Sequence, residues 1–171
     1  MIDPMSPNTK LLFEAFQSDH ANLAKDLYAL RISLSEGQAQ ELRSQAAYIL
    51  ETAGAHIAFE EFDFYPILKP MLEHGEINRM YLEHAQGLEV IKILAECKSD
   101  IFENKRFLVH ALAGLQKLEH HIADCRNLFW AVCALEDSQS LDLLERLNNW
   151  HKKAPSWQDL EGLTADIKKA C

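Results

Sequence analysis

The feature that most limits the fold of this chain is a set of long apolar stripes. They begin near Phe13, Leu42, Ile77 and Leu108, and their members recur three and four residues apart over several turns. Such spacing places apolar side chains on one face of an α-helix. Glycine and proline, 6 and 5 of 171 residues, are scarce, which also favours long helices over short strands joined by turns. We therefore expect an all-α fold.

Start and stop signals divide the chain into four long helices. Ser6 before Pro7 is typical of an N-cap, and Ser35 and Gln38 have the spacing of a capping box at the start of the second helix. Pro66 and the proline at position 70 interrupt that helix. The expected helices cover roughly residues 7–33, 37–65 with a shorter piece after it, 77–97, and a long stretch that follows a partly irregular segment at 100–106. Short connections predict an up-down-up-down four-helix bundle over about 7–134.

A weaker stripe follows the fourth helix. It predicts a fifth helix after residue 137, and Ser156 with Asp159 at capping-box distance predicts a last short one. We expect this tail, about 137–170, to pack across the bundle or to form a homo-oligomer contact. No Ser/Gly-rich linker precedes it, so residues 1–171 are interpreted as a single domain.

Charge and composition exclude several classes of partner. The formal net charge is −9, from 26 acidic and 17 basic residues, and basic residues do not cluster, so we expect neither nucleic acid nor a membrane surface as a partner. No apolar run approaches the ~18 residues that a membrane span requires, and the N-terminus does not resemble a secretion signal. The 4 cysteines have neither paired metal-site spacing nor disulfide-scaffold density. A cytoplasmic protein is expected.

Four of the 8 histidines fall on the apolar stripes, one in each long helix: His20, His56, His84 and His121. A buried polar group without a partner costs ~1–3 kcal/mol, and one metal centre would satisfy all four rings. Glu60 lies one helical turn after His56, so that helix can supply a nitrogen and an oxygen to the same centre. These donors suit iron, manganese or zinc.

Several short motifs resemble the hemerythrin-like, HHE cation-binding family over about residues 7 to 133. They are His20 in the first helix, H-x-x-x-E-E-x-x-x-Y-P from His56 to Pro66, Glu83-His84, and His121-Ile122 followed by Leu128-Phe129. The resemblance implies a hemerythrin-like four-helix bundle that holds a non-haem di-iron centre. Members of the family bind O2 or NO, sense oxygen or iron, or take part in iron handling and in the repair of iron centres.

The resemblance also implies a ligand set. The terminal ligands would be His20, His56, His84 and His121, and the bridging carboxylate would be Glu60. The chain departs from the family at Leu88, where oxygen-carrying members have another histidine, and at Cys125, near the place of a second carboxylate. Asp124 and His120 form an alternative pair if the fourth helix is rotated. Cys125 is interpreted either as a thiolate ligand or as a small core residue.

The neighbours of these ligands have expected supporting roles. Glu61 and Glu83 are expected as hydrogen-bond partners of the ligands or as solvated acids. Tyr28 or Tyr65 is expected to donate a hydrogen bond to the centre. The aromatic residues Phe16, Phe59, Phe64 and Phe129 are interpreted either as core packing, which is also the alternative for the two tyrosines, or as groups that restrict water.

Three hypotheses for function follow. The first is a small hemerythrin-like protein whose iron centre binds O2 or NO, for sensing, storage or protection. The second is a mononuclear iron or zinc site that stabilises the fold or reports metal supply, which Leu88 and Cys125 favour. The third is a metal-free helical interaction module. Phosphate-binding glycine loops and nucleophile motifs are missing from the sequence, so we expect a metal-binding protein rather than an enzyme.

Overall fold

The computed structural model describes residues 5–73 and 75–161, and over these residues the chain is all-helical, as expected. The elements are α1 (Pro7–Glu36), α2 (Ala39–Thr52), α3 (Gly54–Phe59), the π-helix η1 (Glu60–Phe64), α4 (Tyr65–Leu68), the short 3-10 helix η2 (Lys69–Met71), α5 (Glu76–Glu96), the 3-10 helix η3 (Ser99–Glu103), α6 (Lys105–Asn127), α7 (Phe129–Val132), α8 (Asp137–Lys153) and the 3-10 helix η4 (Gln158–Leu160). None of the helices in these described ranges combines the length and the apolar character of a membrane span.

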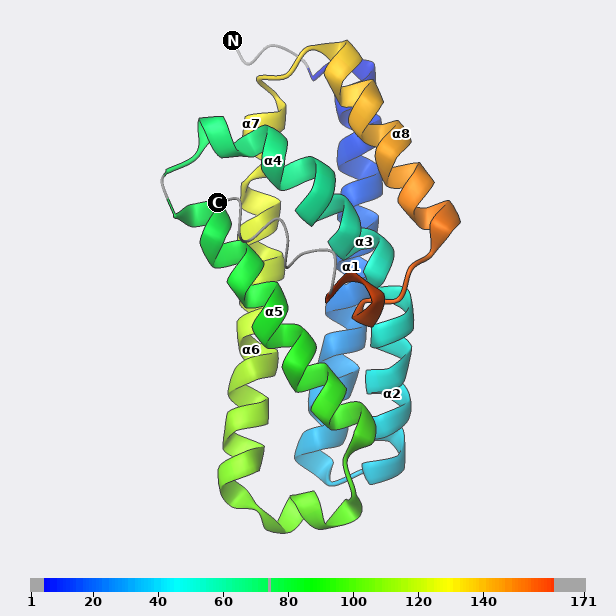
Figure 1. Ribbon diagram of the computed structural model, residues 1–171, viewed down its shortest axis with the longest axis vertical. Coiled ribbons are helices and arrows are strands. Elements are labelled where there is room, and N and C mark those ends of the chain that lie inside the picture. The colour runs from blue at the N-terminus through cyan, green and yellow to red at the C-terminus, as the bar shows by residue number, and fades with distance from the viewer. Residues whose placement is uncertain (1–4, 74, 162–171) are drawn as a thin grey trace.

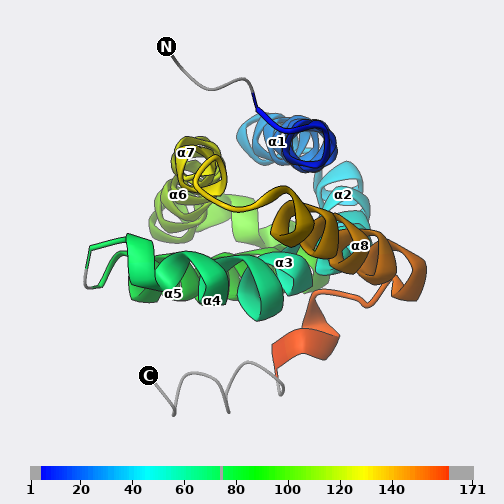
Figure 2. The ribbon, with the colours of Figure 1, turned by 90° about the horizontal axis from the view of Figure 1, so that it is seen from above.

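The four longest helices of the first 127 residues pack against one another. Helix α1 contacts α2 and α6, and α5 contacts the same two helices, so each of the four has two neighbours (Figure 1). Helix α8 lies against α1 and α3, as the view along the long axis also shows (Figure 2). The tail therefore packs across the other helices over 137–153, and the expected helical part beyond residue 161 lies outside the described residues.

The first helix begins and ends at identifiable residues. The backbone N–H of Thr9 donates to the Ser6 hydroxyl, which confirms the predicted N-cap. The helix ends at Gly37, whose φ of 74° lies in the left-handed region that glycine adopts without a steric penalty. The predicted capping box at Ser35 is wrong, because Ser35 still belongs to α1 and its hydroxyl donates to the carbonyl of Arg31.

The second predicted helix is a series of four helical segments, from α2 to α4. Pro66 has no N–H, and in a regular α-helix its ring would collide with the carbonyl of Phe62 four residues earlier. The backbone widens over η1 instead, and the N–H of Tyr65 donates to the carbonyl of Glu60 five residues before it. As a result, Glu60 and Tyr65 lie on the same face of this segment.

Two apolar clusters form the core, and a polar cluster separates them. Leu27, Leu118 and Ile122 belong to the first apolar cluster. Phe16 and Phe64 belong to the second. The four histidines from the apolar stripes and Glu60 are buried among these side chains. A buried group of this polarity requires internal partners, and their geometry defines the candidate site.

Candidate metal centre

Five of the predicted site residues meet at one place in the core. His20 comes from α1, His56 from α3, His84 from α5 and His121 from α6, while Glu60 is the first residue of the π-helix η1. Each of the five residues is at most 5% exposed, and Glu60 is 0% exposed. Five separate segments thus bring their polar side chains together in a water-poor interior.

The two carboxylate oxygens of Glu60 face different pairs of histidines. Its Oε1 lies 3.5 Å from Nε2 of His20 and 3.4 Å from Nε2 of His56. Its Oε2 lies 3.1 Å from Nε2 of His84 and 4.0 Å from Nε2 of His121. Within each resulting group of three, the ligand atoms lie within 4.8 Å of one another, close enough to hold a metal ion. One carboxylate is therefore shared by two groups, each with two imidazoles.

Acidic side chains lie at hydrogen-bond distance from Nδ1 of two of the imidazoles, while Nε2 of each ring faces Glu60. Nδ1 of His84 lies 2.8 Å from Oε1 of Glu61, and Nδ1 of His121 lies 2.8 Å from Oε2 of Glu83. A carboxylate that accepts from Nδ1–H leaves Nε2 free as an electron-pair donor and fixes the orientation of the ring. Of the two predicted roles for Glu61 and Glu83, the structure shows that of hydrogen-bond partner.

The other two imidazoles are oriented from α1. Nδ1 of His20 lies 2.8 Å from the carbonyl oxygen of Phe16, one turn earlier in the same helix. Nδ1 of His56 lies 3.5 Å from Oδ2 of Asp19, an ion-pair distance at which no hydrogen bond is formed. All four rings consequently turn Nε2 toward Glu60.

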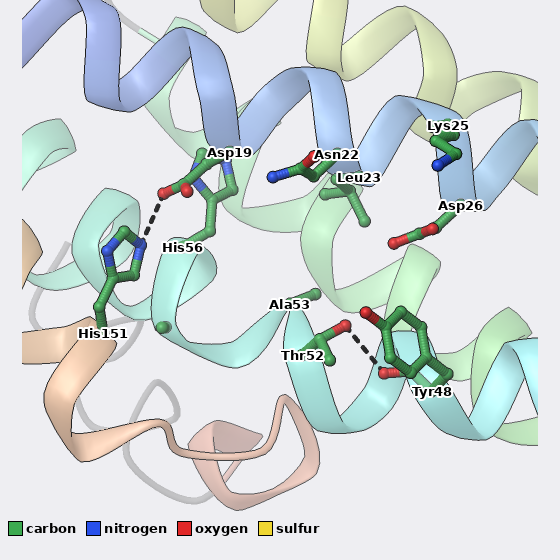
Figure 3. Close-up of a pocket in the computed structure, with 11 residues that line it drawn as sticks. Asp19, Asn22, Leu23, Lys25, Asp26, Tyr48, Thr52, Ala53, His56 and His151 are labelled. Carbon is green, nitrogen blue, oxygen red and sulfur yellow. Dashed lines mark hydrogen bonds and ion pairs between the residues drawn. The ribbon is translucent and has the colours of Figure 1, made fainter.

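Asp19 also connects the centre with the surface. Its Oδ2 lies 2.9 Å from Nε2 of His151 on α8, so the carboxylate stands between a surface histidine and His56 (Figure 3). These three residues border a surface cleft of about 390 Å³ that also contains Asp26 and Tyr48. The sequence analysis missed Asp19, although its position next to His20 is the only local signal of this role.

The surroundings of Nε2 of His20 indicate whether a cation fits this centre. The atom is buried and has no hydrogen-bond partner. An unpaired buried polar atom is unfavourable, and a metal ion between His20, His56 and Glu60 would use its lone pair. The nitrogen and carboxylate donors are those that iron, manganese and zinc accept, so the residues present fit such a metal.

The centre contains both positively charged imidazoles and a negatively charged carboxylate. Burial alone would lower the pKa of both His56 and His84. The carboxylates of Glu60 and Asp19 instead raise the pKa of His56 to about 10. Those of Glu60 and Glu61 raise the pKa of His84 to about 9. Burial would raise the pKa of Glu60, but the charge on His56 and the neighbouring imidazoles of His121 and His20 hold that pKa well below its usual value. His56 and His84 are therefore protonated in the absence of a metal, and a bound cation would replace these protons.

Two neutral groups donate to the shared carboxylate. The hydroxyl of Tyr65 donates to Oε2 of Glu60 at 3.1 Å, and the thiol of Cys125 donates to Oε1 at 2.7 Å. Burial and the neighbouring negative groups raise the pKa of both donors, so both keep their protons at neutral pH. Tyr65 thus has the predicted donor role, whereas Tyr28 is 57% exposed. Cys125 is the buried residue that one of the two interpretations predicted, and it contacts the carboxylate.

The alternative pair on the fourth helix is not formed. His120 is exposed, and Asp124 accepts a hydrogen bond from Arg79 at 3.1 Å. The rotation that would bring these two residues inward is wrong, because it would expose the apolar stripe that includes Leu118 and Ile122.

A small cavity adjoins the centre, and neither Tyr65 nor Cys125 lines it. Its volume is about 10 Å³, enough for roughly one water-sized molecule. The residues that line it are His56, Glu60, His84 and His121 together with Leu23, Leu27, Ile57, Leu118, Ile122 and Trp157. The space next to the potential ligands is therefore small, and most of the residues that line it are apolar.

The centre is thus a buried group of four imidazoles around one shared carboxylate, and it can hold a metal ion. Comparison with protein-family models, with curated proteins and with solved structures finds no match for this chain.

Proposed function

We propose that this chain is a hemerythrin-like protein whose four long helices form an up-down-up-down bundle around two non-haem iron ions. The observation that carries the proposal is the position of Glu60, whose two oxygens face two separate pairs of histidines. A carboxylate in this position is suited to bridge two cations. Manganese or zinc would accept the same donors.

We further propose that the centre binds O2 or NO. Iron would supply one-electron redox chemistry and affinity for such ligands. The protein would exclude bulk water, because Leu27, Leu118 and Ile122 border the adjoining cavity. The hydroxyl of Tyr65 lies 3.4 Å from Nε2 of both His84 and His121, so it can reorient toward a group held there. Binding rather than turnover is proposed, because the cavity that His56, Glu60, His84 and His121 line together is only about 10 Å³ in volume.

Element-resolved metal analysis tests the first part. Protein expressed with iron and purified without chelator should contain close to two irons per chain, and addition of NO to the reduced protein should change its visible absorption. Glu60→Gln should lose most of the metal, because an amide carries no charge and has only one good donor oxygen. Glu89→Gln, a change at an exposed position of α5, should bind like the unchanged protein.

One observation favours a second candidate function. The place near which the family has a further carboxylate is occupied by Cys125, which is buried and neutral. A single iron or zinc ion for structure or sensing would need fewer negative ligands than a pair. One ion per chain without any NO spectrum would support this function, and protein that takes up no ion at all would contradict both candidates and leave a metal-free helical module.

A further inference from the structure

One of the residues that line the cavity beside the centre comes from the segment after α8. This residue is Trp157, which follows α8 and is 2% exposed. The other residues that line the cavity come from α1, α3, η1, α5 and α6. The indole ring of Trp157 lies 6.4 Å from the imidazole of His84, centroid to centroid, with the two planes almost perpendicular. Leu23 and Leu27 of α1 also line the cavity. Removal of the Trp157 side chain would enlarge the cavity.

The segment that carries Trp157, residues 154–161, is attached to helices on two sides, and we call it the C-terminal strap. The N–H of Trp157 donates to the carbonyl of Leu50 in α2 at 2.7 Å. Near its end, Lys92 of α5 donates to Oε2 of Glu161 at 2.9 Å. In Figure 1, η4 correspondingly lies between α5 and the junction of α2 with α3. The strap thus spans two helices and places Trp157 over the cavity.

Gly54 allows the strap to approach the helices this closely. A methyl group at this position would overlap the carbonyl oxygen of Pro155 and lie 2.7 Å from the backbone nitrogen of Trp157. All of these contacts are with backbone atoms, so the strap itself would have to move. The strap can therefore take its observed path only because Gly54, the first residue of α3, has no side chain.

We propose that Trp157 determines which ligands fit the cavity beside the metal centre, and that the strap holds it in place for this purpose. The inference rests on the proposed function. A cavity of about 10 Å³ holds roughly one water-sized molecule, so NO or O2 would enter it with only a small displacement of the walls. Triatomic anions, such as azide and thiocyanate, are excluded while the indole is in place.

Anion titration of the metal-loaded protein is the first measurement. Trp157→Ala should bind azide and thiocyanate at least about tenfold more tightly than the unchanged protein, while NO still binds. Trp157→Phe should lie between the two. The matched control is Trp130→Ala, because Trp130 is 62% exposed on α7 and lines no cavity named above. Unchanged anion affinity in Trp157→Ala would overturn the proposal.

Xenon binding by the metal-free protein gives a readout that does not depend on the centre. Xenon occupies enlarged apolar cavities, so chelator-treated Trp157→Ala should show saturable xenon-induced shifts of the methyl resonances of Leu118 and Leu23. The unchanged protein and Trp130→Ala should not show them. Equal xenon uptake in all three would contradict the closure by Trp157.

Gly54→Ala provides a second variant with all ligands and cavity-lining side chains intact. The methyl group should displace the strap and give the same direction of change in anion and xenon binding, while helix content is kept. Wild-type selectivity in both Gly54→Ala and Trp157→Ala would reject the inference, while normal metal content would leave the proposed function standing. Absence of metal in the unchanged protein would instead reject the proposed function and the ligand selectivity that rests on it.

Discussion

Glu60 and the histidines around it have a direct effect on the stability of the metal-free protein. Burial opposes charge on the imidazoles, but the acidic partners raise the pKa of His56 to about 10 and that of His84 to about 9, from an ordinary value of 6.5. Above pH 6.5 the folded state then binds more protons than the unfolded state. Their contribution to stability is complete below this pH and is lost as the pH rises through the two folded-state values.

We therefore expect the thermal midpoint of chelator-treated protein to fall progressively between about pH 7 and pH 10. Differential scanning calorimetry at constant ionic strength would measure it. Metal-loaded protein is the control, since ligand histidines are already deprotonated and the fall should be much smaller. A midpoint that stays level or rises over this range would show that His56 and His84 are neutral in the fold.

Cysteine reactivity provides a second prediction at this scale. Burial and the neighbouring Glu60 raise the pKa of the Cys125 thiol, while Cys133 is exposed. Because the thiolate is the reactive form, iodoacetamide should modify Cys133 in the native protein and leave Cys125 unmodified until the chain is unfolded. Peptide mass spectrometry would resolve the two sites. Equal rates at both would mean that solvent and reagent enter the centre.

The sequence predicts residues whose position follows from helical spacing. His20, His56, His84 and His121 lie on apolar stripes, and Glu60 follows His56 by one turn, so all five could be identified. Asp19 and Trp157 could not. Asp19 is on a different helix from His56, and Trp157 enters the core from a segment with little periodicity, so both roles depend on contacts between residues far apart in the chain.

At the scale of the elements, the π-helix η1 is the feature that most affects the centre. It places Tyr65 on the same face as Glu60, and the hydrogen bond between them is 3.1 Å long. Restoring an N–H at position 66 would allow the widened turns to revert in part to a regular α-helix. Pro66→Ala should therefore keep the helical circular dichroism but weaken metal binding by about 10-fold or more, since partners of the ligands contribute about this much.

Competition with a chromophoric chelator would measure that affinity. Pro70→Ala is the matched control, because Pro70 lies in η2, outside the centre, and is exposed. Unchanged affinity in Pro66→Ala would show that the π-helix is independent of this proline.

Helix boundaries were predictable where a local signal decides them. The Ser6 cap and the irregular stretch at 99–104 agree with the sequence analysis. The Ser35 box failed because Gly37 ends α1 two residues later and leaves Ser35 inside the helix. Similarly, Pro66 marked where the second helix is disturbed, but the choice between a break and a widened turn depends on the packing of Glu60 and Phe64 in the core.

At the scale of the whole molecule, metal binding should stabilise the fold. Segments α1, α3, η1, α5 and α6 contribute the ligands, and these segments come together only in the folded chain. A ligand that binds only the folded state adds about 2.7 kcal/mol when its concentration is 100 times its dissociation constant. Chelation should accordingly lower the thermal midpoint by several degrees, and added iron should restore it.

Calcium serves as the control ion, because it prefers oxygen ligands and should restore nothing. A midpoint that does not respond to chelator or iron would indicate that the histidine cluster satisfies its own hydrogen bonds in the fold.

The shared carboxylate would also couple the binding of one ion to the binding of the other. Because Oε1 and Oε2 belong to one group, an ion held with His20 and His56 withdraws electron density from the oxygen that faces His84 and His121. It also fixes the orientation that the second ion needs. The two binding steps therefore have a coupling free energy, and linkage makes this energy identical whichever ion enters first. The first ion would therefore change the affinity for the second, and the centre would not fill as two independent sites.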